Sequence, residues 1–143
     1  MTIKQLSVFI ENRQGRLADI TKTIAEAGVD IRALSVADTT DYGILRLIVS
    51  APDRAVEALR AAGMTASTTE VIGIIIPDEP GGFAKAVAVL SGEGISIEYA
   101  YAFITPTVGR AYVIIRVEDN EGAQRALSAA DISIVSQAQI EKI

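Results

Sequence analysis

The chain has 143 residues, of which 50% are hydrophobic, and it carries a formal net charge of −5 with no cysteine and no histidine. This composition excludes disulfides, a thiolate nucleophile, zinc–thiolate sites and the imidazole base that enzymes use most often. The acidic balance disfavours nucleic acid and anionic membranes as partners; with no apolar run of roughly 18 residues and no signal-peptide pattern at the start, a cytoplasmic location is expected.

The first part of the chain predicts the order strand, helix, strand, strand, helix, strand. Apolar side chains alternate from Leu6 to Ile10, which is typical of a strand. They recur at three- and four-residue spacing from Leu17 to Ala27, which is typical of an amphipathic helix. Gly28 follows where glycine commonly ends helices. The remaining elements of this part are predicted at 29–37, 44–50, 52–62 and 64–69.

The second part predicts the same order again. Strands are expected at 71–76, 95–104, 111–117 and 132–136, and helices at 83–90 and 123–130. The last residues, 137–143, are predicted to form a short extra strand that buries Ile140 and Ile143.

The spacing of the glycines indicates an internal repeat. Three glycines of the first part return 66 residues later, in the pairs Gly15/Gly81, Gly28/Gly94 and Gly43/Gly109. Two copies of a βαββαβ unit predict an α+β protein made of two ferredoxin-like units, at 1–70 and 71–143, docked side by side without a linker. Each unit is expected to have an antiparallel four-stranded sheet with two helices on one face.

The loop between the first strand and the first helix of each copy is the candidate binding site. The first N–H groups of a helix have no partner inside the helix, and a glycine such as Gly15 or Gly81 lets a carboxylate or phosphate approach them. Asn12 offers a donor and an acceptor beside the first loop, whereas Asp78 at the matching place only accepts. The same residue types are also common in turns and caps that bind nothing.

Two further groups of side chains allow two interpretations each. Arg13 and Arg16 flank the first loop and either bind a carboxylate or lie in solvent. Tyr99, Tyr101 and Phe103 alternate along one predicted strand and form either part of the core or an interaction face.

These segments resemble the ACT domain family of small regulatory modules that bind amino acids. The family's pattern is strand, Asn-x-Pro-Gly-x-Leu, helix, Gly-Val-Asn-Ile, strand. The first copy has Asn-Arg-Gln-Gly-Arg-Leu at 12–17 and Gly-Val-Asp-Ile at 28–31, and the second has Asp-Glu-Pro-Gly-Gly-Phe at 78–83 and Gly-Ile-Ser-Ile at 94–97. The resemblance covers nearly the whole chain, and the first loop is especially similar to the serine-sensing module of phosphoglycerate dehydrogenase.

The resemblance implies an amino acid held between two modules, by the loop of one and the second strand of its neighbour. The positions that match the family's contacts are Asn12, Gly15, Asp30, Ile31, Asp78, Gly81, Ser96 and Ile97. Gln14, Arg16 and Pro80 lie in the same loops and complete the candidate site. Gln14 replaces the usual proline and loosens the first loop, and Asp78 replaces the usual asparagine, which weakens the case for binding by the second copy.

We therefore expect a regulatory protein that binds a small amino acid at an inter-module site, with no metal or cofactor, as a homodimer. The alternative is a regulatory subunit of a biosynthetic enzyme, similar to the small subunit of acetolactate synthase, that acts by protein contact. Catalysis is disfavoured because a chain without histidine and cysteine would need an unusual Ser/Lys or carboxylate pair, and no lysine lies beside a serine in these motifs.

Overall fold

The computed structural model describes residues 1–11, 13–38, 41–104 and 107–143. The first part of the chain forms β1 (Ile3–Glu11), α1 (Arg16–Glu26), β2 (Ile31–Asp38), β3 (Tyr42–Val49), α2 (Pro52–Ala61) and β4 (Ala66–Pro77). The second part forms α3 (Gly82–Gly92), β5 (Ile97–Ala102), β6 (Arg110–Val117), α4 (Asn120–Ala129), β7 (Ser133–Val135) and α5 (Gln137–Lys142). The α+β class and the repeated βαββαβ order predicted from the sequence are confirmed.

The chain divides into two compact units, and each unit includes a few residues from the opposite end of the chain. The N-terminal unit comprises Lys4–Thr69 together with Ile140–Ile143, and the C-terminal unit comprises Glu70–Gln139 together with Met1–Ile3. The division lies inside β4, which therefore contributes residues to both units. The strands predicted separately at 64–69 and 71–76 are thus one strand, because no turn-forming residue interrupts the β-branched sequence between them.

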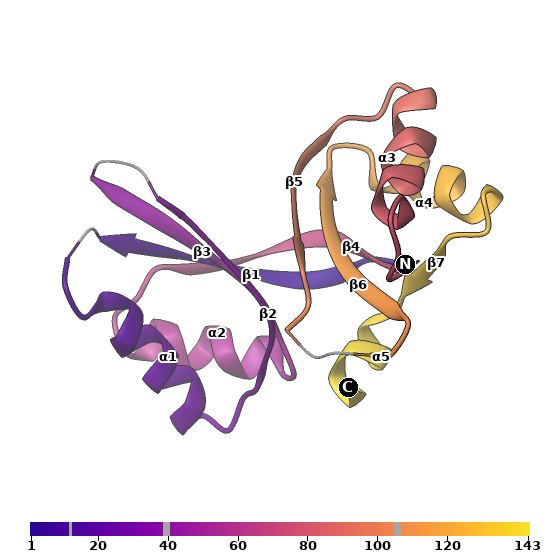
Figure 1. The fold of residues 1–143 in the computed structure, drawn as a ribbon. Coiled ribbons are helices and arrows are strands. Elements are labelled where there is room, and N and C mark those ends of the chain that lie inside the picture. Colours follow the sequence, from indigo (N-terminus) through magenta and orange to yellow (C-terminus); the bar gives the residue numbers. More distant parts are fainter. Residues whose placement is uncertain (12, 39–40, 105–106) are drawn as a thin grey trace. The chain divides into compact units, whose positions relative to one another are not determined.

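The N-terminal unit has the strand order β4-β1-β3-β2, with β3 antiparallel to β1 and to β2. The helices α1 and α2 cover one face of this sheet (Figure 1). The register places Leu6 opposite Leu47 and Val8 opposite Leu45, and all four side chains are at most 1% exposed. The apolar stripe of α1 contributes Ile20 and Ile24 to the same core.

The C-terminal unit repeats this arrangement with the strand order β7-β4-β6-β5. The helices α3 and α4 cover the face that carries Ile72, Ile74 and Ile115 (Figure 1). Because β5 pairs with β6 so that Ala100 lies opposite Ile115, the alternating aromatic side chains of β5 lie on the other face. They are half-buried there, so the aromatic stripe is not part of the helix-covered core.

The tail of the chain is a helix, and the prediction of an extra strand at 137–143 was wrong. Ser136 and Gln139 form a reciprocal capping box: the Gln139 N–H donates to Ser136 Oγ at 3.2 Å, and the Ser136 N–H donates to Gln139 Oε1 at 2.8 Å. Ile140 is nevertheless completely buried, as the prediction for the tail expected. The cap satisfies N–H groups that a helix start leaves free. It outweighs the basis of the strand prediction, which was the alignment of 137–143 with 69–75 at an offset of 68 residues.

In the described part of the chain, no helix combines the length and the apolar character needed to cross a lipid bilayer.

Candidate functional site

The β1–α1 loop of the N-terminal unit leaves free donors at the start of α1. Gly15 lies at the N-cap with a φ of 87°, a left-handed conformation that glycine adopts at little cost. The Arg16 N–H donates to the Arg13 carbonyl at 3.3 Å, and the Asp19 N–H donates to the Gly15 carbonyl at 3.0 Å. Between them, the N–H groups of Leu17 and Ala18 have no partner among the residues that the structure describes. These two donors and the positive end of the helix dipole favour an anion.

A cavity of about 300 Å³ lies beside the start of α1, and Leu17 and Ala18 are among the residues that line it. Its lining comes from the end of β1, the loop, the first turn of α1, β2 and β3: Ile10, Glu11, Arg13, Gly15, Leu17, Ala18, Val36 and Gly43. The volume is at the lower end of the range for small-molecule sites. Apolar walls, one carboxylate, one guanidinium and free amides together suit a small zwitterion with an apolar or small polar side chain.

The predicted residues of the first loop lie in or beside this cavity, except one that falls outside the described part of the chain. Gly15 lines the cavity and Gln14 is exposed next to it. The Arg16 side chain is only 19% exposed and approaches Asp19 at 3.8 Å, so it packs along the helix start and is not free in solvent. Asn12 lies outside the described residues.

The β4–α3 loop of the C-terminal unit has the same backbone pattern. Gly81 has a φ of 86°, and the Lys85 N–H donates to its carbonyl at 3.0 Å. The N–H groups of Phe83 and Ala84 likewise have no partner within the described ranges. Pro80 is exposed in the turn before Gly81. The two loops are therefore equivalent in conformation, as the 66-residue repeat predicts.

The two loops differ in their side chains. The Asp78 N–H donates to the Gly109 carbonyl at 3.1 Å, which fixes the backbone and leaves an exposed carboxylate near the start of α3. A Cβ atom at Gly82 would lie 2.2 Å from the Pro77 carbonyl oxygen, whereas the N-terminal unit has Arg16 at the matching position. The β4–α3 loop is thus held tightly against the end of β4, and its charge disfavours a carboxylate ligand.

The predicted strand residues do not meet the loop residues of their own unit. Asp30 and Ile31 lie where β2 begins, after α1 has run its 11 residues away from Gly15. A helix of that length spans about 16 Å. Asp30 and Ile31 are consequently absent from the cavity lining, and one small ligand cannot bridge the two places within the N-terminal unit.

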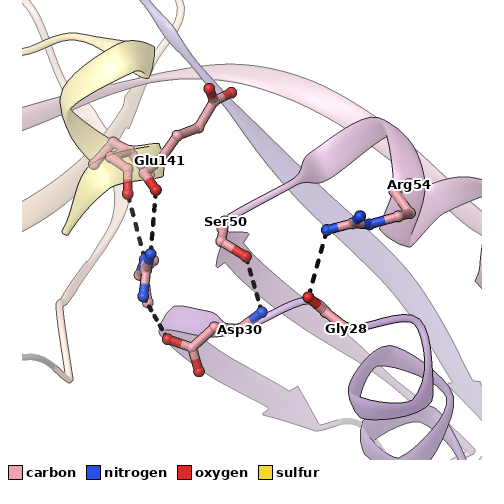
Figure 2. Close-up of polar contacts among 7 residues, drawn as sticks. Gly28, Asp30, Ser50, Arg54 and Glu141 are labelled. Carbon is pink, nitrogen blue, oxygen red and sulfur yellow. Dashed lines mark hydrogen bonds and ion pairs between the residues drawn. The ribbon is translucent and has the colours of Figure 1, made fainter.

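Hydrogen bonds within the N-terminal unit hold the start of β2 (Figure 2). The Asp30 N–H donates to Ser50 Oγ at 2.9 Å, and the Ser50 N–H donates to the Asp30 carbonyl at 2.9 Å. An Arg54 guanidinium N–H donates to the Gly28 carbonyl at 3.4 Å. The Asp30 carboxylate forms an ion pair with Arg32.

Sequence reasoning missed Arg32 as a partner of Asp30. Opposite charges two residues apart in a predicted strand are the signal that could have found this pair. Ile31, between them, is half-buried and packs against the core of the unit.

The equivalent place in the C-terminal unit is acidic. Ser96 lines a hollow of about 430 Å³ together with the carboxylates of Glu93, Glu98, Glu118 and Asp119. Glu98 occupies the position that Arg32 has in the first copy, and its carboxylate lies 3.5 Å from Arg116. Ile97 is half-buried against the core. Among the described residues, no group of carboxylates is arranged to hold a metal ion, including those of this hollow.

Comparison with known proteins places these features in a family. The sequence model of the ACT domain pair matches residues 1–143. The solved structure of protein BT0572 from Bacteroides thetaiotaomicron is 36% identical, with a TM-score of 0.93, and the alignment covers 100% of this chain and 98% of that one. No curated protein matches.

More distant solved structures share the fold. The ligand-free regulatory subunit of aspartate kinase from Thermus thermophilus is 23% identical with a TM-score of 0.65, over 89% of this chain and 91% of that one. The corresponding subunit from Thermus flavus is 22% identical with a TM-score of 0.61, over 90% and 92%. The family match over the whole sequence and the 36% identical structure agree with the two loop motifs, and the chain belongs to the ACT domain pair family.

Proposed function

We propose that this protein is a regulatory amino-acid sensor whose ligand binds at the β1–α1 loop of the N-terminal unit. The observation that carries the proposal is that Leu17 and Ala18, whose N–H groups have no partner among the described residues, line a cavity of about 300 Å³. A free amino acid has a carboxylate for these donors and is small enough for the cavity. Membership of the ACT domain pair family supports the same class of ligand.

The two charged groups of the ligand have separate partners in this proposal. The carboxylate accepts from the N–H groups of Leu17 and Ala18 and lies near Arg13. The ammonium group lies between two carboxylates, Glu11 of the same unit and Asp30 of a second module, with Asn12 as the further partner that the family resemblance implies. The ligand side chain contacts Ile10, Leu17 and Val36, which form the apolar walls.

A second module is needed to complete the site that the resemblance implies. Asp30 and Ile31 lie at the far end of their own unit from this cavity, so they can contact the same ligand only from another copy of the module. A homodimer of the chain would supply such a copy. Binding would then favour the assembly in which the two modules are correctly placed, and that shift is the regulatory signal.

A thermal-shift screen of the common amino acids tests the proposal, with Ala18→Glu as the diagnostic variant. A glutamate in the first turn of a helix stabilises the fold by about 0.3–1 kcal/mol, so the unliganded variant stays folded. Its carboxylate repels the ligand carboxylate, and we expect at least about a tenfold loss of affinity. Ala84→Glu makes the same change at the matching exposed position of the C-terminal unit and should leave the response unchanged. A flat screen of the folded wild type contradicts the proposal.

A regulatory subunit that acts by protein contact is the second candidate. Leu34 and Val36 on β2 are 42% and 48% exposed, and β2 lies at the edge of the sheet order that the structure describes. Exposed apolar side chains on an edge strand favour a protein partner. The partner would be a biosynthetic enzyme; two of the similar solved structures are named as regulatory subunits of aspartate kinase. Copurification of an enzyme that is lost in Leu34→Lys but kept in Ala18→Glu would favour this candidate.

We propose no catalytic role for the chain. Its sequence lacks histidine and cysteine, and the cavity offers binding groups without a nucleophile beside a base. An amino acid incubated with the protein should therefore be recovered chemically unchanged, as measured by proton NMR of the mixture. Consumption of the amino acid would contradict this part of the proposal.

A further inference from the structure

The last residues of the chain are held by an arginine of β2. Ile140–Ile143 belong to the N-terminal unit, which also contains Arg32. The Arg32 Nε–H donates to the Ile140 carbonyl at 3.3 Å, and an N–H of its second terminal nitrogen donates to the Glu141 carbonyl at 3.3 Å. Its remaining terminal nitrogen contacts the Asp30 carboxylate (Figure 2). One guanidinium thus joins the start of β2 to the end of α5.

The two charged groups of this network differ in exposure. The Arg32 side chain is 13% exposed, whereas the Asp30 side chain is 70% exposed. Arg32 is shielded because it lies against the last turn of α5 and donates to the Ile140 and Glu141 carbonyls, the first of which also accepts from the Ile143 N–H at 3.4 Å. A shielded cation depends on its counter-charge, and a solvent-facing carboxylate is open to a second cation.

We propose that Asp30 and Arg32 couple the binding of a ligand ammonium group to the docking of residues Ile140–Ile143. The proposal rests on the proposed function, in which Asp30 of one module faces the ligand bound to another. An ammonium group at Asp30 neutralises the carboxylate and leaves Arg32 without a counter-charge in a shielded place. Arg32 then moves towards water, its bonds to the Ile140 and Glu141 carbonyls weaken, and the C-terminal residues undock more often.

The coupling is reciprocal and belongs to one unit. By linkage, anything that undocks Ile140–Ile143 raises the affinity of Asp30 for a cation by the same factor. The C-terminal unit has Ser96 and Glu98 at the two matching positions, and neither can form this pair. The chain therefore contains one module with this coupling and one module of the same fold without it.

Hydrogen exchange of the wild type and three variants tests the coupling without any ligand. Asp30→Asn removes the charge that an ammonium group would neutralise and keeps the side-chain shape. Arg32→Gln removes the guanidinium that donates to the Ile140 and Glu141 carbonyls. Arg54→Gln is the control, because Arg54 donates to the nearby Gly28 carbonyl and is not among the residues that hold 140–143. The readout is the exchange rate of the amides of 140–143 relative to those of α1 in the same molecule.

We expect the relative exchange of 140–143 to rise about tenfold in Arg32→Gln, since hydrogen bonds to a charged group are lost. Asp30→Asn should raise it severalfold, and Arg54→Gln should leave it at the wild-type value. Arg32→Lys keeps the charge without the planar fork and should lie between the wild type and Arg32→Gln.

Two results would overturn the inference. If the exchange rate of 140–143 is unchanged in Asp30→Asn but raised in Arg32→Gln, Arg32 holds these residues independently of Asp30. Equal increases at α1 and at 140–143 would show general destabilisation in place of undocking. Neither result depends on an amino acid, so failure of the ligand screen and failure of the coupling are separate outcomes.

Discussion

Gly82 shows how a single residue distinguishes the two loops. A Cβ atom at this position would lie 2.2 Å from the Pro77 carbonyl oxygen, which is backbone and cannot rotate away. The first copy has Arg16 at the matching position, so the same backbone pattern there leaves more space at the end of β1. The closer contact at Gly82 is therefore a property of the C-terminal unit.

We predict that Gly82→Ala lowers the free energy of unfolding by about 1–3 kcal/mol, the usual cost of overpacking. Gly92→Ala is the matched control at the other end of α3. No atom lies within 4 Å of a Cβ built there, and its φ is not positive, so alanine should stabilise the protein by about 0.5–1 kcal/mol. Urea unfolding measures both, and equal effects of the two changes would contradict the packing argument.

At the scale of residues, the loop positions were easier to predict than the long-range contacts of Arg32. Gly15 and Gly81 mark their loops because a positive φ at a helix start is a local requirement of the backbone. The contacts of Arg32 with the Ile140 and Glu141 carbonyls could not be predicted because these acceptors lie more than a hundred positions along the chain. A local sequence pattern does not indicate a hydrogen bond between residues that only the fold brings together.

The elements with a strong period were predicted well. The apolar stripe of α1 and the alternation in β1 recur in the structure because burial on one face requires these spacings. The strand predicted for the tail was wrong because few apolar residues supported it, whereas a capping box precedes a helix there. Ser-Gln-Ala-Gln at 136–139 is a sequence signature of a helix start and should have outweighed Ile140 and Ile143.

We predict that Ser136→Ala frays α5. Loss of an N-cap serine costs about 1 kcal/mol, and α5 has only six residues to compensate. The amides of α5 should therefore exchange several times faster in this variant. Ser128→Ala, at an exposed position on α4, is the control and should leave them unchanged. Unchanged α5 exchange in Ser136→Ala would mean that burial of Ile140 alone holds the helix.

The whole molecule carries two copies of one loop with different chemistry. Both loops have two N–H groups without a partner in the described part of the chain, but the C-terminal unit adds the Asp78 carboxylate, which repels an anion. We therefore predict one amino acid bound per chain, measured by isothermal titration calorimetry. In Asp78→Asn the second loop regains the family's residue, and a second, weaker binding event should appear. Two equal sites in the wild type would contradict the asymmetry.

The central claim is that the first-turn amides of α1 hold a ligand carboxylate. Two-dimensional NMR of labelled protein, titrated with the amino acid found in the thermal-shift screen, observes these amides directly. We expect the Leu17 and Ala18 amide protons to shift downfield as the ligand saturates the protein, while those of Phe83 and Ala84 stay in place. A ligand that saturates the protein and leaves the Leu17 and Ala18 signals unmoved would contradict it.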